Sequence, residues 1–280
     1  MLIVGKSAGT PRTRALAVAL RRLVTDSGLP VRELGKRVGV SHGTISLWTN
    51  GKLIPKVSQI DVLMQVLCVP DVERHRIREL TEHAREQDWL TIGQPGVTEQ
   101  LAVVLECERT AKYATDWAPD VIPGLLQTGD YARTILGRRS DLPNLDARVA
   151  LRVGRRDVLT RAVRPLQLTA LVGEKAIRYC IGSPTVRNHQ LRYLLTMAEA
   201  ETVTIRVVPL GHEWHPSRMG PFIVYEFEDD PPIVHLEHHR SGTFLYNEND
   251  VEEYRAIAVE TGERAMTPEK SAAFIAKHVK

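Results

Sequence analysis

Hydrophobic residues recur at helical spacing through the first third of the chain and predict a run of short helices. Leu16, Leu20 and Leu23 lie three or four residues apart, so they share one face of a first helix. Four more helices, each with an apolar face, are predicted at residues 32–38, 41–49, 58–68 and 71–90. Helices so close in sequence make one compact all-α domain, which we place at residues 13–92 behind a flexible lead-in of residues 1–12.

The pattern changes at residues 93–96, a Gly-Gln-Pro-Gly stretch that predicts a domain boundary. Beyond it, strands are predicted at residues 166–171, 203–208, 221–227, 233–237 and 243–246, where apolar, β-branched and aromatic runs are bounded by turn residues. Helices are predicted at residues 98–116, 128–137, 144–160, 173–180, 184–199, 248–264 and 268–278. The predicted fold class is therefore α+β: a five-helix N-terminal domain, then a larger α+β domain at residues 97–280 with a small, partly antiparallel sheet.

Charge is unevenly distributed between these two parts. The whole chain of 280 residues has a net charge of +3, yet residues 1–56 carry ten Lys or Arg against two acidic residues. A basic N-terminal region followed by an acidic remainder indicates that the N-terminal region binds a polyanion. On charge alone, a solvated charged face explains the asymmetry equally well.

Composition favours a cytoplasmic protein. Hydrophobic residues are 43% and charged residues 25% of the chain, which is typical of a globular domain and excludes a disordered chain. No apolar run approaches the ~18 residues of a membrane helix, and no signal-peptide core follows the first methionine. The three scattered cysteines, Cys68, Cys107 and Cys180, are expected to be buried thiols in a reducing compartment.

Residues 31–48 have the pattern of two helices joined by a glycine turn. Gly35 stands where one helix must approach the other with almost no side chain between them, and Gly39 supplies the left-handed residue of the turn. Ser41 is a natural N-cap for the second helix. The side chains predicted to face the core are Leu34, Val38, Val40, Ile45 and Trp48.

The opposite face of the second helix is small and polar, which suits an approach to base edges in the major groove of DNA. Arg32 and Ser41 open the two helices, where side chains and backbone N–H groups bind phosphates. Lys52 and Lys56 follow the second helix and are expected to meet the DNA backbone. The predicted DNA-binding set is Arg32, Ser41, His42, Gly43, Thr44, Ser46, Thr49, Asn50, Lys52 and Lys56.

This segment resembles the helix-turn-helix of the XRE family, the Cro and phage-repressor type. The family's W-E-x-G ending stands here as Trp48-Thr49-Asn50-Gly51, with Thr in the Glu position. The resemblance implies a sequence-specific regulator that binds a double-stranded DNA operator as a homodimer.

Residues 121–132, with the string P-G-L-L-Q-T-x-x-Y-A, resemble the signature of the C-terminal domain in actinobacterial, antitoxin-like XRE regulators. Chemically the string is structural, with a Pro-Gly turn, two packing leucines and Thr128 as a helix cap. Stretches that fit the same domain are residues 106–111, 173–178, 190–191, 207–210, 220–222 and 233–237. Arg155, Arg156 and His235 depart from the family's usual residues. The resemblance implies a regulator often encoded beside a small partner protein that this domain binds.

Histidines concentrate at residues 212–215 and 235–239, which raises the alternative of a metal site. Strand alternation would put His235, Glu237 and His239 on one face. The first cluster lacks the second His of an H-E-x-x-H motif, and we favour exposed loop and edge-strand histidines. A metal-binding sensor is therefore the least favoured function, and no metal ligands are assigned.

The sequence offers no catalytic constellation. A nucleotide-binding Gly loop and a G-x-S-x-G nucleophile elbow are both absent. Glu106 and Glu108 lie two apart on one predicted helix, so they point to different faces, and Cys180 is expected to be a buried thiol. We therefore expect no enzymatic activity, no catalytic residues and no cofactor.

These observations favour a cytoplasmic, dimeric transcriptional regulator that reads an operator with its second helix-turn-helix helix. The C-terminal domain would then sense a partner protein or a ligand. The alternative is an antitoxin that chiefly binds and masks a small partner protein, with DNA binding as autoregulation.

Overall fold

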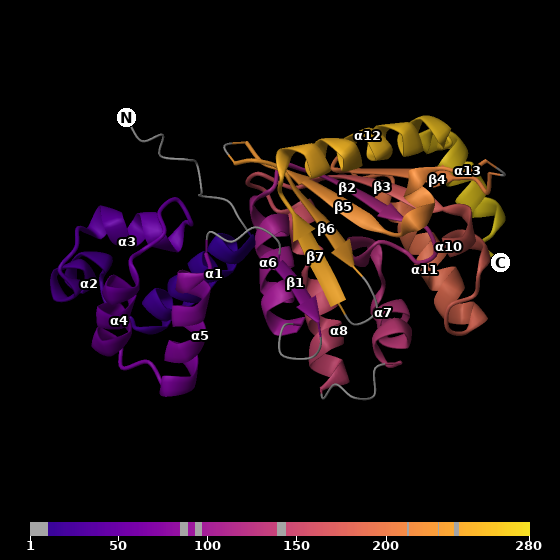
Figure 1. The fold of residues 1–280 in the computed structure, drawn as a ribbon. Coiled ribbons are helices and arrows are strands. Elements are labelled where there is room, and N and C mark those ends of the chain that lie inside the picture. Colours follow the sequence, from indigo (N-terminus) through magenta and orange to yellow (C-terminus); the bar gives the residue numbers. More distant parts are fainter. Residues whose placement is uncertain are drawn as a thin grey trace. The chain divides into compact units, whose positions relative to one another are not determined.

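The structure, a computed structural model, describes residues 11–84, 89–92, 97–138, 144–211, 213–228, 230–237 and 241–280. The chain divides into two compact units whose elements are drawn in Figure 1. The first unit comprises Met1–Cys107, Asp229–Pro231 and His238–Asn247, and the second comprises Glu108–Glu228, Pro232–Glu237 and Glu248–Lys280. The division thus falls inside a helix, whereas the sequence places a boundary at residues 93–96, which lie outside the described residues.

The first unit is built on a helical domain. Its elements are α1 (Pro11–Asp26), α2 (Val31–Val38), α3 (His42–Thr49), α4 (Val57–Val66), α5 (Asp71–Glu82), β1 (Trp89–Ile92), the greater part of α6 (Val97–Thr110) and β7 (Ser241–Leu245). The five helices α1 to α5 are those predicted from hydrophobic spacing. Strands β1 and β7 form an antiparallel pair.

The core of the helical domain contains the apolar residues that the helical spacing singled out. Leu34, Ile45 and Trp48 are fully buried, and the most buried residues of the other helices include Leu16, Leu20, Ile60, Leu63 and Ile77. Removing such side chains from water is the main force that holds short helices together, since helices of eight residues are not stable alone. Val40, also predicted to face the core, is only half-buried.

Two glycines set the geometry of the turn between α2 and α3. Gly39 has a φ of +78°, the left-handed conformation predicted for it, and it ends α2. At Gly35 a Cβ atom would lie 2.8 Å from the carbonyl oxygen of Val40, so only glycine lets the two backbones come this close. Ser41 caps α3 as predicted, because its side chain accepts a hydrogen bond from the backbone N–H of Thr44.

The second unit is an α+β domain around a mixed sheet. Its strands are β2 (Tyr113–Ala118), β3 (Gln167–Gly173), β4 (Val203–Val208), β5 (Phe222–Glu226) and β6 (Ile233–Glu237). They lie in the order β6-β5-β2-β3-β4, in which β3 runs parallel to β2 and β4, and β5 runs antiparallel to β2 and β6. The sheet is therefore partly antiparallel, as predicted.

Helices cover this sheet on both faces. They are α7 (Gly129–Leu136), α8 (Leu145–Gly154), α9 (Asp157–Thr160), α10 (Glu174–Arg178), α11 (Pro184–Met197), α12 (Glu248–Arg264) and α13 (Pro268–Lys277), with the 3-10 turns η1 (Gly124–Leu126) and η2 (Pro216–Met219). Figure 1 shows α12 along one face of the sheet and α7 and α8 on the opposite side. None of the helices among the described residues is long and apolar enough to cross a membrane.

Four local expectations are corrected by the structure. Residues 113–116, predicted as the end of a helix, belong to β2, because pairing with β3 and β5 outweighs the local helical spacing. Helix α5 ends at Glu82 rather than near residue 90. Helix α1 begins at Pro11, inside the expected lead-in. Of the cysteines expected to be buried, Cys107 is buried but Cys68 and Cys180 are exposed.

We predict that Gly35→Ala destabilises the α2–α3 segment by ~1–3 kcal/mol, because the added methyl group meets backbone atoms that cannot move aside. The measurement is the opening free energy of α2 and α3 from native-state hydrogen exchange. Gly43→Ala is the matched control: its Cβ would lie 3.6 Å from the Ser41 hydroxyl, an ordinary contact. That control should be neutral or stabilising by up to ~1 kcal/mol. A Gly35→Ala protein as stable as the control would contradict the prediction.

Candidate nucleic-acid interface

The outward face of α3 carries the polar residues predicted to read bases. His42, Ser46 and Asn50 are exposed and lie four residues apart, so they share one face, while Ile45 and Trp48 are buried on the other. Gly43, Thr44 and Thr49 are half-buried at the margins of this face. The structure thus presents a small, polar helix surface of the kind that enters a major groove.

Several hydroxyl groups of this face are already engaged with the helix itself. Ser41 Oγ accepts from the Thr44 backbone N–H at 3.0 Å and lies 2.9 Å from the Thr44 hydroxyl. The Thr49 hydroxyl donates to the Ser46 carbonyl at 3.1 Å. Asn50 Nδ2 donates to Ser46 Oγ at 3.3 Å. Within the described chain nothing hydrogen-bonds the ring of His42, so this side chain is the most available for a base edge.

The cations predicted to meet phosphates are exposed around α3. Arg32, Lys52 and Lys56 are exposed, as is Lys36 one turn after Arg32. Arg37, by contrast, donates to Glu33 at 3.1 Å, which offsets its charge. Exposed cations at helix ends suit the positioning contacts that proteins make to the DNA backbone.

An exposed leucine on the reading helix was missed by the sequence reasoning. Leu47 is 43% exposed and Leu53, just after the helix, is 44% exposed. The signal was present, since residue 47 lies four after Gly43 and three before Asn50, on the same outward side of a helix. An apolar side chain on such a face is suited to contact a thymine methyl group.

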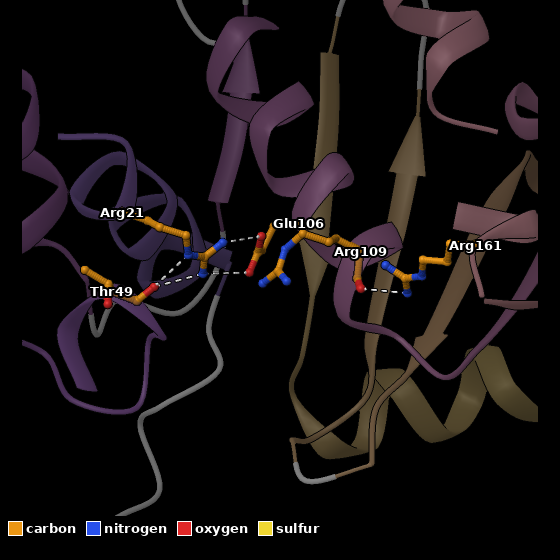
Figure 2. Close-up of polar contacts among 5 residues, drawn as sticks. All are labelled: Arg21, Thr49, Glu106, Arg109 and Arg161. Atoms are coloured by element: carbon orange, nitrogen blue, oxygen red, sulfur yellow. Dashed lines mark hydrogen bonds and ion pairs between the residues drawn. The ribbon is translucent and has the colours of Figure 1, made fainter. Parts of the chain in front are cut away.

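Arg21 of α1 is a second residue that the sequence reasoning did not single out. Figure 2 shows its guanidinium between the end of α3 and Glu106 of α6. It donates to the Thr49 carbonyl oxygen from Nε at 3.2 Å and from Nη2 at 2.8 Å, and to both carboxylate oxygens of Glu106 at 3.1 and 3.2 Å. No spacing rule connects residues 21 and 106, so only the fold reveals this contact.

In the second unit, the residues of the P-G-L-L-Q-T string hold a turn together. The side chain of Gln190 accepts from the Thr128 backbone N–H and donates to the Leu126 carbonyl, each at 2.7 Å. Gln127 donates to the Ile122 carbonyl at 2.7 Å. Thr128 does stand at the N-cap of α7, but its hydroxyl makes no capping bond. The string is therefore part of the interior of the second unit.

Charged groups gather on one face of the sheet in the second unit. Arg155 and Glu108 form a two-point ion pair at 2.9 and 2.5 Å, with both side chains buried. Asp116 on β2 and His235 on β6 both pair with Ile223 of the strand between them, β5. Their side chains therefore lie on the same face of the sheet. Such buried charges are stable only where partners offset their desolvation.

Burial shifts the pKa values of Asp116 and His235 in opposite directions. Loss of solvent, followed by the nearby Glu237 carboxylate, raises the pKa of Asp116 to about 7. Loss of solvent lowers the pKa of His235 to about 4. At neutral pH His235 is therefore neutral, and Asp116 is close to its midpoint of titration.

The structure describes two histidines of these clusters, and the expectation that they are exposed is wrong for both. His215 and His235 are each 5% exposed. The His215 ring lies 2.8 Å from the Ser217 hydroxyl and 3.0 Å from a carboxylate oxygen of Glu260. His212, His238 and His239 lie outside the described residues. No group of three or more metal-binding side chains occurs in the described ranges.

Two family models match the chain. The model described as a helix-turn-helix domain matches residues 15–77, which contain α2, the Gly39 turn and α3. The model described as a domain of unknown function, DUF5753, matches residues 101–277, more than half of the chain. No curated protein sequence matches the chain. The helix-turn-helix prediction is confirmed, while the XRE subtype and the antitoxin-like signature stay predictions.

Among solved structures, the chain is similar to TrmBL2, an archaeal chromatin protein whose structure shows a novel mode of DNA binding. The likeness covers 74% of this chain and 67% of that chain, at 14% sequence identity and a TM-score of 0.32. A similarity this loose supports no conclusion about the present chain.

We predict that Asp116→Asn changes how the stability of the second unit depends on pH. Because the folded-state pKa of Asp116 is raised to about 7 from 3.8, the folded protein keeps a proton that the unfolded chain loses between these values. Asp116 therefore lowers the free energy of unfolding as pH rises through this interval, by ~4 kcal/mol in all. His235 acts oppositely, losing stability as pH falls from 6.5 toward 4.

Asp116→Asn should therefore gain stability over the native protein progressively from pH 4 to 7, with a constant difference above that range. Unfolding free energies from hydrogen exchange of β2 and β3 at several pH values measure this. His235→Gln is the control, since it removes the opposite slope and leaves that of Asp116. Parallel pH profiles for the native protein and Asp116→Asn would show that the Asp116 pKa is not raised.

Proposed function

The chain belongs to the DUF5753 family and carries a helix-turn-helix domain, and from this premise we propose that it is a sequence-specific DNA-binding transcriptional regulator. The observation that carries the proposal is the face of α3 formed by His42, Ser46 and Asn50, exposed beside buried Ile45 and Trp48. Polar side chains at this spacing on a helix after a glycine turn can reach base edges.

The electrostatics of the helical domain support the same proposal. The exposed cations Arg32, Lys36, Lys52 and Lys56 lie on or next to the two helices of the motif. Contacts of this kind supply most of the affinity and make it depend steeply on salt, because each neutralised phosphate releases bound counterions. Base discrimination would come from the α3 face.

We assign the chain an XRE-type mode of action on the sequence resemblance, with binding as a homodimer to a two-fold-related operator. The second unit would sense a partner protein or a ligand, and the assigned role is regulatory, with no catalytic step. Leu125, Leu126, Gln127 and Thr128 of the string that resembles antitoxin-like regulators are all buried, so a partner protein or ligand would bind another part of the second unit.

The proposal is tested by sequencing genomic DNA fragments that the purified protein retains, beside a His42→Ala, Ser46→Ala, Asn50→Ala triple variant. These three side chains are exposed, so their removal should leave the fold intact. We expect enrichment of a two-fold-symmetric site that the triple variant loses. A site retained equally by the triple variant would mean that another surface reads DNA. Absence of any enriched site, with or without the product of the neighbouring gene, would refute the proposal.

On the enriched site, His42→Ala and Arg32→Ala should have different effects. His42→Ala should reduce discrimination at one base position by ~1–3 kcal/mol, because a base-edge contact is lost. Arg32→Ala should weaken all sequences alike and lower the salt slope by about 1, because one phosphate contact is lost. Fluorescence anisotropy titrations on matched and mismatched sites at several salt concentrations separate the two effects.

Arg78→Ala is the matched charge control for Arg32→Ala. Arg78 is exposed and paired with Asp61 and Glu82 on α4 and α5, outside the motif. Its removal should leave both affinity and slope unchanged. A sequence-selective loss for Arg32→Ala would overturn its assignment to phosphate.

A further inference from the structure

The last carbonyl groups of α3 are satisfied in two different ways. A helix leaves its final carbonyls without intrahelical partners, so each needs another donor. The backbone N–H groups of residues 50, 52 and 51 donate to the carbonyls of Ser46, Leu47 and Trp48. The Thr49 carbonyl receives its donors from Arg21, through both Nε and Nη2. Arg21 thus completes the end of the helix that carries the proposed reading face.

Arg21 is itself fixed by a buried carboxylate. Glu106 is 7% exposed and accepts from Nη1 and Nη2 of Arg21 at 3.1 and 3.2 Å. Together with the Thr49 contacts, these bonds use the fork of the guanidinium on both edges, which a lysine cannot reproduce. All three nitrogens of the Arg21 guanidinium already donate within the protein, and the Glu106 carboxylate offsets its charge, which disfavours a phosphate contact.

The helix that carries Glu106 is also fixed at its C-terminal end. Arg161 Nη2 donates to the Arg109 carbonyl at 2.9 Å, in the last turn of α6 (Figure 2). An arginine therefore caps the end of α6 as Arg21 caps the end of α3. This contact restrains the turn of α6 from which Glu106 extends.

We propose that Arg21 is a positioning residue of the DNA-reading helix: it fixes the C-terminal end of α3 through the Thr49 carbonyl, and Glu106 holds it in that position. The inference rests on the proposed DNA binding and deepens it. Arg21 is one of the ten basic residues of residues 1–56, and its proposed role is to orient Asn50 and its neighbours on the reading face. Arg21 is accordingly not one of the phosphate contacts.

The first test compares Arg21→Met with Arg22→Met on the enriched operator and on mismatched operators over a range of salt. Arg22 is the matched control, since it lies next in α1, is mostly exposed and pairs only loosely with Asp26 at 3.5 Å. A positioning role predicts that Arg21→Met loses discrimination between the sites about tenfold with an unchanged salt slope, and that Arg22→Met retains discrimination. A slope lower by about 1, with equal loss on all sites, would make Arg21 a phosphate contact and overturn the proposal.

The second test needs no DNA and so separates this inference from the proposed function. In the free protein, the backbone N–H groups of Asn50, Gly51 and Lys52 donate within the end of α3. Their hydrogen exchange should be about tenfold faster in Arg21→Met and unchanged in Arg22→Met. Unchanged exchange in Arg21→Met would overturn the positioning role. Faster exchange in a protein that retains no DNA would uphold the contact and refute the DNA-binding proposal instead.

Two milder variants keep the test decisive if Arg21→Met does not fold. Arg21→Lys keeps the charge but has a single nitrogen, so it loses the separate Nε and Nη1 bonds to Thr49 and Glu106, and exchange at the end of α3 should still increase. Glu106→Gln keeps a hydrogen-bond acceptor for Arg21 but removes the negative charge that holds it. Hydrogen exchange at the end of α3 should therefore increase, by less than in Arg21→Met. Native exchange and discrimination in both variants would overturn the proposal.

Discussion

The close contact of backbones at Gly35 is the constraint on which the reading face depends. The carbonyl of Val40 and the N–H of His42 lie 2.8 and 3.2 Å from where a Cβ of residue 35 would be. This contact fixes how α3 leaves the turn, and therefore which of its sides meets the core. Ile45 and Trp48 are buried on the inner side of α3. Helical spacing therefore places His42, Ser46 and Asn50 on the outer, exposed side.

A helix placed in this way still frays at its ends unless the unpaired N–H groups of its first turn and the unpaired carbonyls of its last turn find partners. At the N-terminal end, the Ser41 side chain accepts a hydrogen bond from the Thr44 backbone N–H. At the far end Arg21 donates to the Thr49 carbonyl, where its positive charge also meets the negative end of the helix dipole. Both ends of the proposed reading helix are thus fixed by polar side chains.

The sequence was informative wherever the cause of a structure lies within a few residues. The turn at Gly39, the cap at Ser41 and the boundaries of α3 and α12 follow from local chemistry, and the structure has them where they were predicted. Strand β2 was missed because its partners β3 and β5 begin more than fifty residues later. The Arg21–Glu106 contact and the burial of His235 have the same long-range origin, and no spacing rule anticipates them.

The structure also shows which basic residues of residues 1–56 are already paired with acidic residues. Several of its cations already have acidic partners: the pairs are Arg14 with Asp230, Arg21 with Glu106, Arg22 with Asp26 and Arg37 with Glu33. Among the described residues of the motif, Arg32, Lys36, Lys52 and Lys56 are exposed without such a pair. Because each phosphate contact contributes about 0.9 to the salt slope, contacts from these four would together contribute roughly 4 for each DNA-bound copy of the domain. The basic residues of residues 1–56 are therefore not equivalent: Arg21 is held by a buried carboxylate and orders the end of α3, whereas the four exposed cations are placed to meet phosphates.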